Sequence, residues 1–195
     1  MAVLLLAAIL LLEIRSISKE KLEEEKKASR TFLNMANTDS LTGVRNKHAY
    51  SENEKAVNQQ IQAGGLEKLA VVVGDINGLK YINDTKGHAA GDQLIKDACA
   101  LICEYFTHGA VFRVGGDEFV VLLQGKGYDS MAEVVRDLNR KVEENIEKDA
   151  VVISIGYSAL QPGDQQLRDV FERADQMMYE RKKELNAMGA PTSRQ

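Results

Sequence analysis

Two acidic residues stand side by side directly after a pair of glycines, and a third acid ends an apolar run earlier in the chain. Asp117 and Glu118 follow Gly115-Gly116, and Asp75 closes the earlier run. Adjacent glycines between β-branched runs predict a tight hairpin that uses positive φ angles, with both acids at its exposed tip. If the run that ends at Asp75 is a neighbouring strand, the acids meet at one edge of a sheet, where they repel each other unless a cation binds. Mg²⁺ favours a few carboxylates together with substrate phosphates, so the pattern predicts a phosphoryl-transfer site.

Further polar residues that suit a nucleotide follow Asp75. Lys80 lies one turn or so into the next expected helix, whose first N–H groups and dipole attract phosphate. A carboxylate together with an amide matches the hydrogen-bonding edge of guanine, and Asp92 and Asn83 supply that pair. Taken singly, each is also an ordinary cap or turn residue, and Asp92 after Gly91 has the position of a helix N-cap. The sequence has no Gly-x-x-x-x-Gly-Lys-Ser/Thr loop, which excludes a P-loop nucleoside triphosphatase.

The segments that must position these residues alternate between strand-like and helix-like patterns. This alternation predicts an α/β class of fold, an α+β sandwich whose mixed sheet is flanked by helices. Helices are expected at Asn46–Ala63, Leu79–Asn83, Asp92–Tyr105, Ser130–Glu147 and Leu167–Leu185. Strands are expected at Leu69–Asp75, Ala110–Val114, Glu118–Gln124 and Val151–Tyr157. Loops are expected at Gly87–Gly91 and Gly125–Gly127.

Four blocks of the sequence resemble the GGDEF family of diguanylate cyclases, in the family's order and over about residues 39–186. They are Asp39-Ser40-Leu41-Thr42-Gly43 with Asn46, Asp75 to Asp84 followed by Gly87-His88 and Gly91-Asp92, Gly115-Gly116-Asp117-Glu118-Phe119, and Ala174-Asp175 with Tyr179 and Lys182. The resemblance implies the palm-like fold shared with nucleotide cyclases and polymerases, with a mainly antiparallel central sheet.

The resemblance also implies a role for each site residue. The metal ligands would be Asp75, the backbone carbonyl of Ile76, Asp117 and Glu118, with Mg²⁺ as the cofactor and Mn²⁺ as a substitute. Glu118 would assist either the metal or the attacking 3′-hydroxyl. The substrate would be bound by Lys80, Lys182, Asn83, Asp92, Gly115 and Gly116, and Lys80 would join Asp117 and Glu118 in catalysis. The alternative for Lys182 is a solvated lysine between Arg181 and Lys183, and we assign no histidine to catalysis.

The activity implied is the condensation of two GTP molecules into cyclic di-GMP by a homodimer, with release of two pyrophosphates. A non-catalytic GTP-binding module of the same fold is the alternative, and a cyclase of another dinucleotide is a further rival. Two departures from the family bear on this. The Arg-x-x-Asp product site has Phe106 and Gly109 at its two positions, so we expect no feedback inhibition there. The closing Lys-x-x-Gly-Arg-Asn motif has Asn186 in place of its arginine.

The first 36 residues read as a separate part, followed by the catalytic domain over 37–195. Residues 2–12 are an unbroken apolar run, too short to cross a bilayer, which needs about 20 residues. Four alternatives remain: the stub of a truncated transmembrane helix, an interfacial anchor, one end of a dimerising helix, or a buried helix of a soluble protein. We favour the stub, because Arg15, Lys19 and Lys21 follow it as in a segment facing the cytoplasm. The expectation is a cytoplasmic catalytic domain, anchored to the inner membrane in the full-length protein.

Glu13–Met35 predicts a continuous helix, since it holds no Gly or Pro and is rich in helix formers. Its heptad-like spacing is half polar, so a solvated helix and a parallel dimer stalk both fit, and the resemblance favours the stalk. The net charge of −4 argues against a nucleic-acid surface. Cys99 and Cys103 lie on one helix face and read as small buried hydrophobes.

Overall fold

The computed structural model describes residues 15, 17–27, 32 and 34–192. The chain divides into two compact units, Met1–Asn37 and Thr38–Gln195. In the first unit all described residues are helical, which confirms the expected helix for that part of it. The apolar run 2–12 lies outside the described residues. Among the described residues, no helix combines the length and hydropathy needed to span a membrane.

The second unit is built on a five-stranded sheet in the order β1-β3-β4-β2-β5. The strands are β1 (Arg45–Asn46), β2 (Ala70–Ile76), β3 (Gly109–Arg113), β4 (Glu118–Leu123) and β5 (Ile153–Ala159). β1 runs parallel to β3, and every other neighbouring pair is antiparallel. The mixed, mainly antiparallel sheet predicted from the sequence is therefore confirmed. β1 was not predicted, because a strand of two residues is too short to show an alternating hydrophobic pattern.

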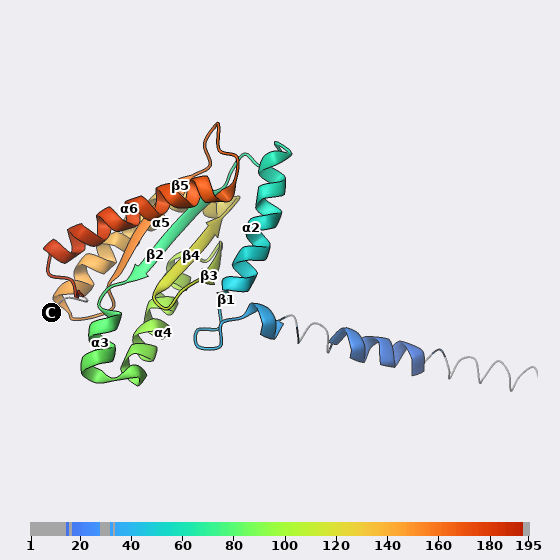
Figure 1. Cartoon of the computed structure of the whole chain (residues 1–195), viewed down its shortest axis with the longest axis horizontal. Helices are drawn as coiled ribbons and strands as arrows, with labels where there is room; N and C mark the ends of the chain where they lie inside the picture. The colour runs from blue at the N-terminus through green and yellow to red at the C-terminus, as the bar shows by residue number, and fades with distance from the viewer. Residues whose placement is uncertain (1–14, 16, 28–31, 33, 193–195) are drawn as a thin grey trace, which may run out of the picture. The chain divides into compact units, whose positions relative to one another are not determined.

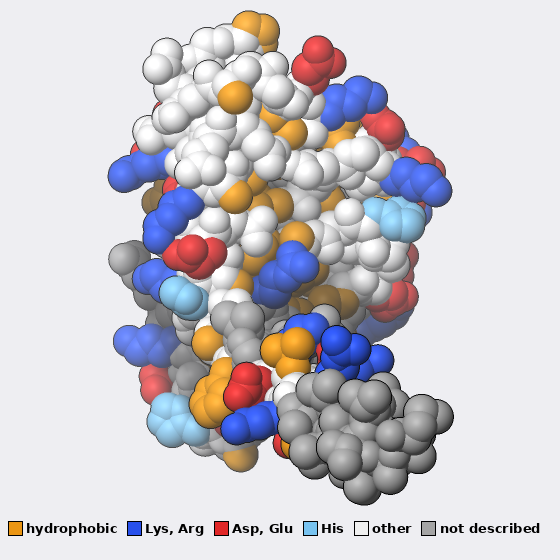
Figure 2. Space-filling model, turned by 90° about the vertical axis from the view of Figure 1, so that its right-hand side faces the viewer, with side chains coloured by type: hydrophobic (Ala, Val, Ile, Leu, Met, Phe, Trp, Pro, Cys, Tyr) orange, Lys and Arg blue, Asp and Glu red, His pale blue; other side chains and the backbone are white. Residues whose placement is uncertain are grey.

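Five helices pack around this sheet; four cover its two faces, and one short helix lies beyond the end of β2 (Figure 1). They are α2 (Lys47–Gln62), α3 (Leu79–Lys86), α4 (His88–Tyr105), α5 (Lys126–Glu147) and α6 (Leu167–Ala187). Side chains alternate across a strand, so Val71 and Val73 of β2 pack with α2 and α6, whereas Val72 packs with α4 and α5. Two apolar clusters result, one on each face of the sheet. On the face shown in Figure 2, acidic and basic side chains are interspersed around apolar ones.

The loop expected at Gly87–Gly91 is wrong, and so is the N-cap position of Asp92. α4 begins at His88, which places Asp92 inside the helix. Gly87 alone makes the reversal between α3 and α4, because its φ of +83° is in the region that favours glycine. Gly91 is buried in α4 against the Asn83 side chain, where an added Cβ would collide with the amide. Gly91 thus serves close helix packing rather than a loop.

α5 also begins earlier than expected, at Lys126 instead of Ser130. Gly125 takes a φ of +51° and makes the turn alone. Gly127 is helical, and a Cβ there would lie 2.7 Å from the His108 carbonyl oxygen. In both helices, therefore, a glycine that suggested a loop permits close contact within the first turns.

Candidate active site

The site is built where the end of β2 lies beside the start of β4. Asp75 is in register with Glu118, and the Ile76 N–H donates a 3.0 Å hydrogen bond to the Asp117 carbonyl. Directly opposed residues in an antiparallel pair point to the same face. Asp75 and Glu118 therefore share the face that carries α2 and α6. Asp75 is 9% exposed, while Glu118 is exposed at the surface.

The hairpin that presents Asp117 and Glu118 forms, but not for the reason expected. Neither glycine before them has a positive φ. The loop is closed by the Val114 N–H, which donates to the Glu118 carbonyl at 3.0 Å. A Cβ at Gly115 would lie 2.5 Å from the Glu118 Oε2, whereas one at Gly116 would meet nothing within 4 Å. Gly115 is thus needed to leave room for the Glu118 carboxylate.

Electrostatic repulsion among the acids is visible in their pKa values. Burial raises the pKa of Asp75, and the charges of Asp117 and Asp175 raise it further, against the lowering effect of Lys182. Burial likewise raises the pKa of Glu118, with added repulsion from Asp117, Asp75 and Asp175. The four carboxylates therefore act on one another through space. Asp175 was known from the sequence only as part of a motif.

Lys182 lies over this cluster and supplies a positive charge. Its Nζ lies 2.6 Å from the Asp75 Oδ1, and the Lys182 side chain is 33% exposed. A cavity of about 510 Å³ adjoins the pair, lined also by Tyr179 and Asn186. Sequence reasoning placed Lys182 near phosphates and missed its pairing with Asp75, since the two residues are 107 positions apart.

The carboxylates at this site could supply only part of the coordination shell of a divalent ion. Among residues 15, 17–27, 32 and 34–192, no group of three or more His, Cys, Asp or Glu side chains is arranged to hold a metal. Mg²⁺ commonly takes one or two protein carboxylates and completes its shell with substrate phosphates and water. Asp75 and Glu118 are opposed across two strands, and burial followed by repulsion from neighbouring acids raises the pKa of each, so they fit that partial role.

The expected nucleotide contacts come from α3 and α4. α3 begins at Leu79 after Gly78, whose φ is +74°, and Lys80 is exposed in the first turn. Asn83 reaches α4 at Gly91, next to the exposed Asp92. The structure therefore brings Asn83 and Asp92 to neighbouring positions on two packed helices, with Lys80 one turn before Asn83.

An arginine that the sequence analysis did not single out ties the glycine loop to the turn at residues 39–43. Arg113 donates to both Asp39 carboxylate oxygens, at 3.1 and 3.3 Å, and to the Gly116 carbonyl at 2.8 Å. Burial tends to raise the pKa of Asp39, but hydrogen bonds from Thr42 and Arg113 outweigh it and the pKa is lowered. The loop is thereby braced by the segment through which the chain enters the second unit.

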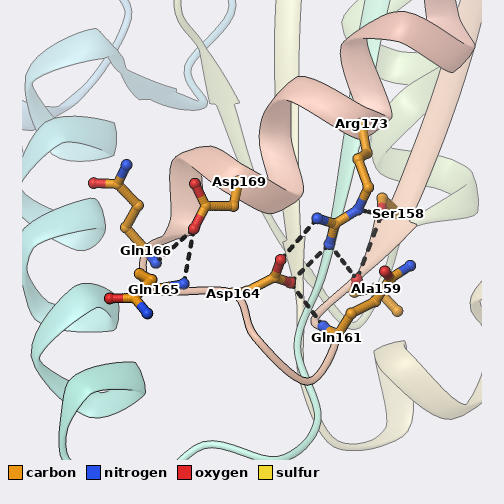
Figure 3. A network of polar contacts seen from close by, with 8 residues as sticks. All are labelled: Ser158, Ala159, Gln161, Asp164, Gln165, Gln166, Asp169 and Arg173. Atoms are coloured by element: carbon orange, nitrogen blue, oxygen red, sulfur yellow. Dashed lines mark hydrogen bonds and ion pairs between the residues drawn. The ribbon is translucent and has the colours of Figure 1, made fainter.

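A second arginine network lies in the N-terminal half of α6, whereas Lys182 lies in its C-terminal half (Figure 3). Arg173 donates to both carboxylate oxygens of Asp164, each at 2.7 Å. It also donates to the Ser158 Oγ at 3.1 Å and to the Ala159 carbonyl at 3.0 Å. These bonds join α6 to the end of β5 and to the loop between them.

Comparison with known proteins gives a family. The family described as "Diguanylate cyclase, GGDEF domain" matches residues 36–187. Diguanylate cyclase A of Treponema denticola is 32% identical over 160 residues, which cover 77% of this chain and 43% of that protein. Diguanylate cyclase DgcP of Pseudomonas aeruginosa is 33% identical over 173 residues, covering 83% of this chain and 25% of that protein. The chain thus spans less than half the length of these relatives.

Solved structures agree with the fold. The coiled coil and GGDEF domain of DgcB from Caulobacter crescentus, in complex with c-di-GMP, superposes with a TM-score of 0.73 at 25% identity, covering 88% of this chain and 94% of that one. The active GGEEF domain of a Vibrio cholerae diguanylate cyclase gives a TM-score of 0.61 at 23% identity, covering 78% and 98%.

Proposed function

Because this chain belongs to the GGDEF-domain family of diguanylate cyclases, we propose that it condenses two GTP molecules into cyclic di-GMP and releases two pyrophosphates. The observation that carries the proposal is the register of Asp75 with Glu118 beneath Lys182. Two carboxylates on adjacent strands could bind a cation, and the lysine ammonium above them could bind the triphosphate that arrives with it. A fold that used these residues only for packing would gain nothing from their repulsion.

We propose Mg²⁺ as the cofactor, with Mn²⁺ as a substitute, held by Asp75, Glu118, Asp117 and the carbonyl of Ile76. When bound, the ion would neutralise the triphosphate and favour attack on its α-phosphorus. Asp75 is the ligand whose environment supports this most, because its carboxylate is buried and faces Lys182 and two further acids. Its present partner Lys182 must then turn from the carboxylate towards phosphate.

The remaining side chains would bind and orient GTP. Lys80 and the first N–H groups of α3 hold phosphate oxygens, while Asn83 and Asp92 bind the guanine edge. Gly115 and Gly116 would leave the loop without side chains where it passes the ribose and phosphates. Glu118 either shares the ion or accepts the proton of the 3′-hydroxyl.

The reaction needs two copies of the site, since each 3′-hydroxyl must attack the α-phosphate of the other nucleotide. We propose that the N-terminal helix brings two chains together and so raises the effective concentration of the partner site. Its described apolar side chains are half or more exposed in the single chain, among them Phe32 at 75% and Met35 at 74%. Residues 2–12 would hold this dimer at the inner membrane with the catalytic units in the cytoplasm.

A GTP-binding regulatory module without activity is the second candidate. The relative named cyclic di-GMP phosphodiesterase PdeR of Escherichia coli is 38% identical over 100 residues, 51% of this chain and 15% of that protein. A module of this family therefore occurs in a protein named for a different activity. Asn186, at the position of the family's closing arginine, favours this candidate as well, because an amide holds phosphate more weakly than a guanidinium.

One assay separates the two candidates. The purified chain is incubated with GTP and Mg²⁺, and the product is identified by mass, beside a Glu118→Gln variant. The proposed function predicts cyclic di-GMP from the wild type and a loss of at least about a hundredfold in the variant. GTP binding without any cyclic dinucleotide would establish the regulatory module instead.

A further inference from the structure

The placement of Lys182 depends on where α6 lies along β5. Lys182 and Asp175 are seven residues apart, two helical turns, so both reach the carboxylate cluster from one helix face. A slip of one residue would move the helix by about 1.5 Å and rotate it by about 100°. That shift would withdraw the Lys182 ammonium from Asp75. Some feature of the structure must therefore fix α6 in both translation and rotation.

The central contact between α6 and β5 is close but carries little direction. Gly156 of β5 lies directly against the α6 backbone, where an added Cβ would collide with the Ala174 carbonyl oxygen and the Met178 nitrogen. Around it the buried side chains of α6 are apolar, including Val170, Ala174 and Met178. The steric fit at Gly156 limits how far α6 can slide, but apolar burial itself is non-directional and adds no orienting contact on this surface.

Directional contacts come from Arg173, one residue before Ala174. Its guanidinium makes the two bonds to Asp164 and the two to the end of β5 described above (Figure 3). The Asp164 side chain is only 8% exposed and also accepts from the Gln161 N–H at 2.7 Å. A planar, bidentate pair defines orientation as well as distance. At the far end of α6, Arg181 donates to Glu143 of α5 and Asn77 donates to Asn186 at 3.3 Å, but neither contact is a bidentate pair.

We propose that Arg173 is a positioning residue for the reaction: its clamp on Asp164 and β5 sets the register of α6 and thereby the place of the Lys182 ammonium in the phosphate site. The inference rests on the proposed function. Arg173 itself contacts none of the reacting groups. It lies nine residues, or about 13 Å along the helix axis, before Lys182.

A double-mutant cycle on nucleotide binding tests this. The variants are Arg173→Lys, which keeps the charge and loses the fork, Lys182→Ala, and both together, each in the full chain. Affinity for a non-hydrolysable GTP analogue is measured with Mg²⁺, beside thermal melting. Arg173→Lys is expected to weaken binding by about tenfold, the size of one lost charge-assisted hydrogen bond, and to have no further effect once Lys182 is alanine.

The matched control is Arg168→Lys on the same helix. Arg168 pairs with Glu172 at 2.7 Å, but both side chains are more than half exposed, so this change is expected to leave affinity unaltered. If Arg173→Lys does not fold, Asp164→Asn takes its place in the same cycle. Effects on affinity that multiply in the double variant would mean that Arg173 acts on binding independently of Lys182 and would overturn the inference. A wild type that neither binds the analogue nor forms cyclic di-GMP would instead defeat the proposed function, and the inference with it.

Discussion

At the scale of single residues, the site depends on close steric contacts and on a balance of opposing charges. Gly115 shows the steric side, because the room it leaves is taken by the Glu118 carboxylate. Asp75 shows the electrostatic side, because burial and two other acids oppose its ionisation while Lys182 favours it. Both residues are recognisable in the sequence, but the steric contact of Gly115 and the charge balance around Asp75 are not. The positive φ expected at Gly115-Gly116 is wrong, since the hairpin is closed without it, by bonds from the Val114 and Gly115 N–H groups to the Glu118 carbonyl.

Gly115→Ala is expected to reduce cyclase activity by at least about tenfold with little change in melting temperature, because the new methyl group would displace the Glu118 carboxylate. Gly116→Ala is the matched comparison, since its methyl group would enter open space, and its effect should be several times smaller. Initial rates of cyclic di-GMP formation measure both. Equal losses in the two variants would contradict the steric role of Gly115.

Asp75→Asn is expected to abolish activity while leaving the fold as stable or more stable at neutral pH. Because the folded-state pKa of Asp75 is raised, the native state binds the proton more tightly than the unfolded chain. Stability should therefore fall as pH rises from the ordinary value near 3.8 through the folded pKa, and the substitution removes that loss. The melting temperature of Asp75→Asn should therefore exceed that of the wild type by a margin that grows between about pH 4 and pH 7.

Asp164→Asn provides the opposite sign. Hydrogen bonding to Arg173 lowers the pKa of Asp164, so its contribution is present above the ordinary pKa and lost as pH falls through the folded one. The variant should lose about 1–3 kcal/mol at neutral pH, because a charge-assisted pair is broken. A lower melting temperature for Asp75→Asn than for Asp164→Asn at neutral pH would reverse this account.

At the scale of elements, the site depends on two arginine braces. Arg113 joins the glycine loop to Asp39, and Arg173 joins α6 to β5. The strands that these braces hold were predictable, because β2, β4 and β5 are apolar runs with clear ends. The start of α4 was not, because Gly87 completes a reversal that sequence reasoning spread over five residues. The Arg113 brace was also hidden, since Arg113 and Asp39 lie 74 positions apart in the chain.

Arg113→Lys is expected to loosen the loop at residues 115–118. Lysine keeps the charge but cannot bond Asp39 and the Gly116 carbonyl together. We expect the turnover rate to fall by about tenfold and amide hydrogen exchange in the loop to quicken. Arg140→Lys is the control, because its pair with Asp137 lies at the surface with 69% of the Arg140 side chain exposed. Unchanged exchange in Arg113→Lys would argue against the brace.

At the scale of the whole molecule, the two units differ in what they contain. The second unit holds every residue assigned to the nucleotide, while the first offers a helix with exposed apolar side chains. The family and its sheet could be predicted from residues 39–186 alone. The pairing of Lys182 with Asp75 could not, because it arises only when α6 packs across the sheet.

Removal of residues 1–37 is expected to lower specific activity mainly at low protein concentration, because the two sites would then meet only by diffusion. Specific activity is measured over a dilution series for the full chain and the truncated one. The curves should converge at high concentration. Equal activity at every dilution would show that the helix does not bring the sites together.

The central claim is that Asp75 and Glu118 together hold a divalent ion beneath a triphosphate. Mn²⁺ binding, followed by electron paramagnetic resonance with a non-hydrolysable GTP analogue, tests it most directly in the wild type, Asp75→Asn and Glu118→Gln. The account predicts tight Mn²⁺ binding that requires the nucleotide, weakened by at least about tenfold in each variant. Mn²⁺ that binds equally well after either substitution would contradict it.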